Sequence, residues 1–71
     1  MANTYLTRLN AEHAELSTRL KSLKAFIGTE AFNKIVTEEK ARLHLQAAIM
    51  EQLADVLAQR IAFNTGLEDN E

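Results

Sequence analysis

The sequence has no cysteine, no proline and no tryptophan, only two glycines and a single tyrosine. Without cysteine, neither a disulfide nor a cysteine-ligated metal can hold the chain together, and the composition suits a reducing compartment. No apolar run approaches the roughly 20 residues of a membrane span, and the first ten residues lack the apolar core of a signal peptide. We therefore expect a cytoplasmic protein with no membrane partner.

The chain is also short, at 71 residues. A single domain of this length buries little surface, and its core rarely supplies more than about 3–5 kcal/mol. Small proteins compensate with disulfides, a structural metal or oligomerisation. Disulfides are excluded, and His13 and His44 have no spacing typical of a metal site. We therefore expect no metal and no cofactor, and we expect the chain to assemble with copies of itself.

An excess of positive charge is lacking too, because the net charge is −2. Three of the ten acids, Glu68, Asp69 and Glu71, lie together near the C-terminal end. The rest of the chain has seven acids and eight bases. Proteins that bind duplex DNA normally have a much larger positive excess. Long nucleic acid is therefore a poor partner, but a small phosphate-bearing ligand needs only a few cations.

What the sequence does contain is helical periodicity. Apolar residues recur at alternating steps of three and four, a pattern typical of a helix that packs along another helix. This series is Leu6, Leu9, His13, Leu16, Leu20, Leu23 and Ile27, with one histidine among its members. It predicts a first helix over about residues 3–27. Asn3 or Thr4 can cap its start, and Gly28 stops it.

Two further helices are predicted after Gly28. A short connecting helix is expected over about residues 29–36, with Thr29 as its N-cap. Thr37 is another N-cap candidate, and a second long helix should follow over about residues 38–64. Gly66 suits the left-handed position that often follows a helix, so we expect the helix to end there. The acidic tail, residues 67–71, is then expected to be frayed.

The second long helix has two apolar stripes. The first stripe can pack against the first helix in a hairpin, whereas the second stripe has no partner within one chain. The first stripe is Leu43, Ala47, Met50, Ala54, Leu57 and Ile61, and the second stripe is Leu45, Ile49, Leu53, Val56 and Phe63. The predicted fold is therefore all-α, a helical hairpin with a short connecting helix. We expect it to assemble into a symmetric homo-oligomeric helical bundle.

No set of residues has the arrangement of a catalytic site. His13 and Ser17 are one helical turn apart, but no acid is placed to orient them. Glu12 and Glu15 lie near one helical face, where Glu15 can instead pair with Arg19 four residues later. We therefore predict a protein that is not an enzyme.

One group of residues suggests a ligand. Tyrosine can stack on a nucleobase, Arg and Lys can hold phosphates, and Ser or Thr hydroxyls can donate hydrogen bonds to phosphate oxygens. The alternative is that lysines near the C-terminal end of the first helix only complement its dipole. The group is Tyr5, Arg8, Arg19, Lys21, Ser22, Lys24 and Thr29.

A spaced pattern of residues also runs through both long helices. It comprises Arg8-Leu9, Glu12, Glu15-Leu16, Arg19-Leu20, Leu23, Phe26-Ile27 and Phe32, followed by Leu43, Leu45-Gln46, Met50, Leu57 and Arg60-Ile61. This pattern resembles the phage anti-CBASS protein 2 family, small proteins that sequester cyclic oligonucleotides (CBASS is cyclic-oligonucleotide-based anti-phage signalling). The resemblance covers about residues 5–63.

The resemblance implies a homo-oligomer, expected to be a hexamer, that binds cyclic dinucleotides between its subunits without cleaving them. Some members also bind cyclic trinucleotides. Cyclic oligonucleotides are the messengers of this immune signalling, and when they are held in this way in the host cytoplasm they do not reach the host's immune effectors. A different function that the residues leave open is a helical protein–protein interaction module, a coiled-coil adaptor or an inhibitor of a host protein, binding through the second stripe.

The resemblance also indicates which residues bind the ligand. Family members use an aromatic residue early in the first helix, and a lysine and a hydroxyl near the end of that helix. Ser22 stands where many members have lysine, and Lys21 and Lys24 flank it. The predicted binding residues are Tyr5, Arg8, Lys21, Ser22, Lys24, Thr29 and Arg60.

Overall fold

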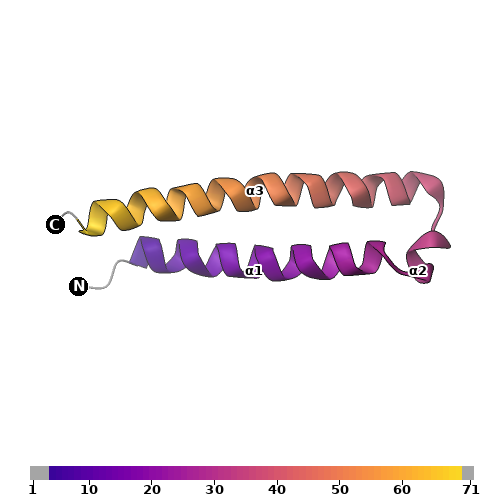
Figure 1. Ribbon diagram of the computed structural model, residues 1–71, viewed down its shortest axis with the longest axis horizontal. Coiled ribbons are helices and arrows are strands. Elements are labelled where there is room, and N and C mark those ends of the chain that lie inside the picture. The colour runs from indigo at the N-terminus through magenta and orange to yellow at the C-terminus, as the bar shows by residue number, and fades with distance from the viewer. Residues whose placement is uncertain (1–3, 70–71) are drawn as a thin grey trace.

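The computed structural model describes residues 4–69, and the side chains of residues 4–66. Within that part the chain is all-helical, as predicted, with α1 (Thr4–Ile27), α2 (Glu30–Asn33) and α3 (Thr37–Asp69). The two long helices run antiparallel side by side, and α2 makes the turn between them at one end (Figure 1). The resulting hairpin is a rod of 54 × 15 × 14 Å. No helix within residues 4–69 combines the length and the apolar character needed to cross a bilayer.

The two long helices pack through the apolar positions that the three-and-four spacing indicated. Every member of the α1 series from Leu6 to Ile27 is buried or half-buried, and so is every member of the first stripe on α3. The deepest contacts come from Leu9 of α1 and Leu57 of α3, which are 3% and 1% exposed. Spacing of this kind keeps one side of each helix against its neighbour along the whole hairpin.

Thr29 is the N-cap of α2. Its side-chain oxygen accepts a hydrogen bond from the amide of Phe32 at 3.2 Å, and its hydroxyl donates to the carbonyl of Phe26 at 2.6 Å. Phe32 is buried and makes edge-to-face ring contacts with Phe26 and His44, with ring centroids 5.9 and 5.4 Å apart. This aromatic cluster closes the turn end of the hairpin.

α2 is shorter than the connecting helix expected over residues 29–36. It ends at Asn33, because the amides of Lys34 and Ile35 bond to carbonyls three residues back, at 3.2 and 3.1 Å. Bonds of this spacing tighten the last turn and reverse the chain. α3 then begins at Thr37, and the carbonyl of Val36 accepts the amides of Glu39 and Lys40. Thr37 therefore lies inside the first turn instead of preceding it.

The C-terminal end of α3 differs from the expectation. Gly66 was predicted to stop the second long helix in a left-handed conformation, but α3 continues through Gly66 to Asp69, and no described glycine has a positive φ. One glycine inside a helix costs only about 1 kcal/mol, a penalty small enough for α3 to continue through Gly66. The backbone of residues 67–69, expected to be frayed, belongs to α3. Asn3, with its proposed cap, and residues 70–71 lie outside the described residues.

The second stripe of α3 is exposed along its whole length. Leu45 and Phe63, at its ends, are 60% and 68% exposed, and Leu53 in the middle is 45% exposed. The stripe extends for roughly 27 Å, taking 1.5 Å per helical residue. Single exposed apolar residues are ordinary on a protein surface, but a continuous row of this length is not. One hairpin therefore leaves the second stripe uncovered.

Candidate ligand-binding site

The predicted binding residues lie at opposite ends of the hairpin. Tyr5 and Arg8 belong to the first turns of α1, and Lys21 to its last turns. Lys21 comes 13 positions after Arg8, which corresponds to roughly 20 Å of helix. One hairpin thus holds two separate groups: the Tyr5 cluster comprises Tyr5, Arg8 and Arg60, and the Lys21 cluster comprises Lys21, Ser22, Lys24 and Thr29.

The Tyr5 cluster joins the start of α1 to the C-terminal half of α3. Nη2 of Arg60 donates a hydrogen bond to the Tyr5 hydroxyl at 2.5 Å, and Cζ of Arg60 lies 5.9 Å from the centre of the tyrosine ring. Together with Arg8, Leu9 and Glu12, the pair lines a hollow of about 270 Å³. Among the described residues, neither Arg8 nor Arg60 forms an ion pair with a carboxylate.

This arrangement suits an anionic ligand with a flat ring. A guanidinium group can hold a phosphate through two parallel hydrogen bonds, and two such groups stand here without a paired carboxylate. The Tyr5 ring is half-exposed, so one of its faces can stack on a nucleobase. Glu12 lines the same hollow. Its carboxylate offsets one of the two guanidinium charges, so Arg8, Arg60 and Glu12 together have a net charge of +1.

The Lys21 cluster offers fewer free groups than the sequence indicated. Nζ of Lys24 pairs with Oε1 of Glu51 on α3 at 2.7 Å, so its charge is already partnered. The hydroxyl of Thr29 gives its proton to the carbonyl of Phe26, and a phosphate oxygen would have to displace that bond. Lys21 and Ser22 are exposed and form no ion pair or side-chain hydrogen bond within the described part of the chain. These two residues remain available to a ligand.

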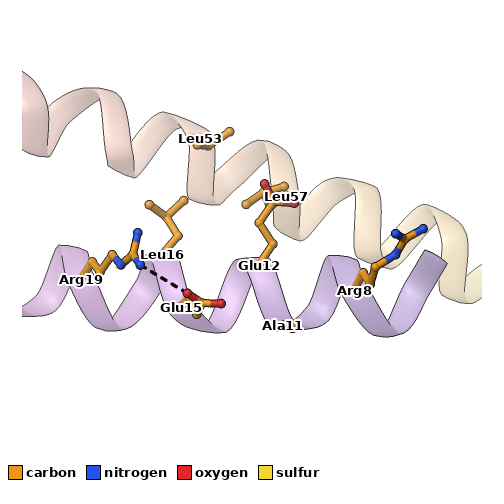
Figure 2. A pocket seen from close by; sticks show the side chains of 8 residues that line it. All are labelled: Arg8, Ala11, Glu12, Glu15, Leu16, Arg19, Leu53 and Leu57. Atoms are coloured by element: carbon orange, nitrogen blue, oxygen red, sulfur yellow. Dashed lines mark hydrogen bonds and ion pairs between the residues drawn. The ribbon is translucent and has the colours of Figure 1, made fainter. Parts of the chain in front are cut away.

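A larger hollow of about 450 Å³ lies between α1 and α3 (Figure 2). Leu16 of α1 and Leu53 and Leu57 of α3 provide its apolar lining, and Leu16 points from α1 towards α3 in Figure 2. This hollow is not apparent from the sequence, in which Leu16 and Leu57 belong to the seam and Leu53 belongs to the second stripe. Leu53 belongs to both surfaces, so the hollow and the second stripe are continuous.

The charged residues of the larger hollow all come from α1. Glu15 and Arg19 form the pair that their four-residue spacing predicted, with 3.4 Å between Oε1 and Nη2. Both side chains are well exposed, so this pair contributes at most about 1 kcal/mol. Arg8 and Glu12 line the other part of the hollow. Two bases and two acids balance one another, so the hollow as a whole does not select the sign of a ligand.

The residues considered for catalysis are not brought together. His13 is half-buried in the α1 seam, Ser17 is exposed, and no hydrogen bond joins their side chains in the described region. No three His, Asp or Glu side chains within the described residues converge as metal ligands would. What the described residues offer a ligand is therefore charge, hydrogen bonds and stacking.

Comparison with known proteins assigns the chain to a family. A family model described as Sequestin matches residues 3–63, which is most of the chain. The matched segment contains all of α1 and α2 and most of α3, with every residue of the Tyr5 cluster and the Lys21 cluster. No match was found among curated proteins or among solved structures.

Proposed function

The chain belongs to the Sequestin family, and on that premise we propose that it binds cyclic oligonucleotides and sequesters them without cleaving them. The name of the family indicates sequestration, and the residue pattern resembles phage proteins that hold cyclic oligonucleotides in this way. The proposed ligands are cyclic dinucleotides, with cyclic trinucleotides as a second class. In the cytoplasm of an infected host, a sequestered messenger no longer reaches the immune effectors that it activates.

The residues of the Tyr5 cluster support this proposal. A cyclic dinucleotide combines anionic phosphates with flat bases, and the cluster combines two guanidinium groups with a half-exposed aromatic ring. Arg60 already contacts both the hydroxyl and the face of Tyr5, so the cationic and stacking groups are held together. Such preorganisation lowers the entropy lost when the ligand binds.

We place the ligand between subunits. Within one hairpin the Tyr5 cluster and the Lys21 cluster are about 20 Å apart, so a single site needs residues from more than one copy. A two-fold interface presents each residue twice, which matches the two phosphates of a cyclic dinucleotide, and a three-fold axis would match a cyclic trinucleotide in the same way. The hexamer that we propose has both kinds of axis if its symmetry is D3.

Sequestration requires tight binding and abundance but no turnover. A nucleotide can be held through charge-assisted hydrogen bonds and stacking alone, and these are the interactions that Arg8, Arg60 and Tyr5 can supply. We therefore expect the protein to release its ligand unchanged.

The test is a thermal-shift screen of the full chain against cyclic di-AMP, cyclic di-GMP and cyclic tri-AMP. A ligand at about 100 times its dissociation constant adds roughly 2.7 kcal/mol of stability, which raises the melting temperature by roughly 10–20 °C. After incubation, the protein is denatured by heat and the nucleotide is analysed by chromatography. Intact cyclic nucleotide supports the proposal. A linear product overturns it in favour of a phosphodiesterase, and no stabilisation by any cyclic nucleotide favours the protein-binding module.

Variants of the Tyr5 cluster localise the site. Arg60→Ala should weaken binding by at least about tenfold, because it removes charge-assisted hydrogen bonds to phosphate. The matched control is Lys34→Ala, which removes an exposed cation of the turn between α2 and α3 that lines neither hollow. Tyr5→Phe keeps the ring and should retain affinity if stacking dominates, whereas Tyr5→Ala should not. Equal affinity for the Arg60→Ala and Lys34→Ala variants would place the site elsewhere.

A further inference from the structure

We infer that the second stripe of α3 is the contact surface for a second copy of this chain, and that the two α3 helices pack antiparallel about a two-fold axis near Leu53. The inference deepens the self-assembly within the proposed function by naming its surface, its partner and its orientation. It does not depend on any property of the ligand.

The exposed apolar area is close to what a stable dimer needs. The five side chains of the second stripe, each roughly half-exposed, leave on the order of 500 Å² of apolar surface uncovered. A two-fold interface buries the same surface on both copies, so the two stripes together remove on the order of 1,000 Å² before any flanking side chain is included. Specific interfaces begin near 1,200 Å² in total.

The small core of the hairpin indicates why the partner is a second copy. Among the described residues, the buried apolar side chains are Leu9, Phe32, Ala47 and Leu57. A core this small leaves the folded hairpin only marginally stable, so covering the exposed stripe stabilises it further. A partner that is present wherever the chain itself is present provides this stabilisation under all conditions. A second copy always meets that condition, whereas a different protein does so only in particular cells.

Charged residues on the same helical face decide the orientation. Glu38, Arg42 and Arg60 continue the three-and-four spacing of the second stripe, so they share its face. In a parallel pair each of them would face its own counterpart, which sets like charges opposite one another. An antiparallel pair separates these like charges and also opposes the two helix dipoles favourably. The stripes of the two copies overlap most when the two-fold axis passes near the midpoint of the stripe, beside Leu53.

This packing also covers the larger hollow. Leu53 lines the hollow together with Leu16 and Leu57, so a partner helix that crosses Leu53 lies over the opening between α1 and α3. The apolar lining of the hollow then contacts the partner's second stripe. Two hairpins joined in this way form a four-helix bundle.

Single-cysteine cross-linking tests the interface, because the chain has no native cysteine. A disulfide forms only where two Cα atoms come within about 7 Å, so a residue cross-links to its own counterpart only near the axis. Leu53→Cys should form a covalent dimer under mild oxidation. Gln52→Cys, an exposed neighbour that leaves the stripe intact, should do the same. Leu45→Cys and Phe63→Cys should not cross-link alone but should cross-link when the two variants are mixed.

The control is Ala58→Cys, an exposed position close to the axis but on the opposite side of α3 from the stripe, which should stay uncross-linked. Efficient self-cross-linking of both Leu45→Cys and Phe63→Cys would indicate a parallel pair and overturn the orientation. A monomeric mass for the unmodified chain in light scattering would overturn the inference altogether. An oligomeric mass without any cross-link along the stripe would assign the interface to another face, and this result would also overturn the inference. None of these measurements involves a nucleotide, so their failure is distinguishable from failure of the proposed function in the thermal-shift screen.

Discussion

Replacing Leu53 with glutamate should split the assembly while leaving the hairpin folded. Leu53 is 45% exposed in one hairpin, so roughly half of its side chain already faces solvent. A glutamate at this position can direct its carboxylate into water and remains a good helix former. We therefore expect the helical content of the isolated chain to change little. In the antiparallel pair, by contrast, residue 53 of both copies lies at the centre of the buried surface.

The magnitude follows from the part of Leu53 that only the partner covers. Fully burying a leucine contributes about 1.5–3 kcal/mol, so covering the exposed half contributes about 1 kcal/mol per copy and about 2 kcal/mol per interface. Two carboxylates close to the axis add a desolvation and repulsion cost of at least a similar size. A total loss of about 4 kcal/mol raises the dissociation constant by on the order of a thousandfold.

The assay combines light scattering with circular dichroism at the same concentration. Leu53→Glu should give a lower mass at micromolar protein, with helicity retained. Ala62→Glu introduces the same charge at an exposed position of α3 away from the stripe, and it should keep the mass of the unmodified chain. If Leu53→Glu retains that mass too, Leu53 is not in the interface and the reasoning is refuted. If both variants dissociate, net charge rather than position is responsible.

Three further predictions concern the core, the end of α3 and the lysines of α1. Leu57→Ala, at a position 1% exposed, should cost about 2–5 kcal/mol and lower the melting temperature strongly, whereas an unchanged transition would show that α1 and α3 do not pack there. Gly66→Ala should raise the free energy of unfolding by about 0.5–1 kcal/mol, because a Cβ there meets nothing within 4 Å; a loss of similar size would indicate a left-handed glycine. Lys21→Ala should weaken binding of cyclic di-AMP by roughly tenfold or more, and Lys24→Ala by less because Glu51 shares its charge. If the lysines serve only the helix dipole, calorimetry will show unchanged affinity and a stability loss under about 1 kcal/mol.

Much of the local structure could be predicted from the sequence, because helical periodicity is a local property. The spacing from Leu6 to Ile27 indicated which side of α1 is buried, and the division of α3 into two stripes separated buried Leu57 from exposed Phe63. The short spacing between Glu15 and Arg19 likewise predicted their ion pair. Each of these depends on residues a few positions apart, whose relative placement a helix determines.

Which of the candidate binding residues lie together depends on contacts between distant parts of the chain. Residue types indicated phosphate and base chemistry, but they could not show which candidates meet. Tyr5 and Arg60 are 55 positions apart in the chain, and only the way α3 returns along α1 brings them into contact. The same return pairs Lys24 with Glu51, a contact that no local spacing indicates. The seven candidates therefore appeared as one set in the sequence and lie as two clusters in the hairpin.

By itself, the sequence determined that the chain is helical, that α1 and the first stripe of α3 pack together, and that α3 has a second apolar stripe outside this contact. These features follow from residue spacing, because a helix converts spacing directly into a face. Only the tertiary structure decided that α3 runs through Gly66, that Arg60 holds Tyr5, and that Leu53 belongs to both the second stripe and the larger hollow. Those outcomes depend on contacts between residues far apart in the chain, whose free energies are balanced only when both helices are in place.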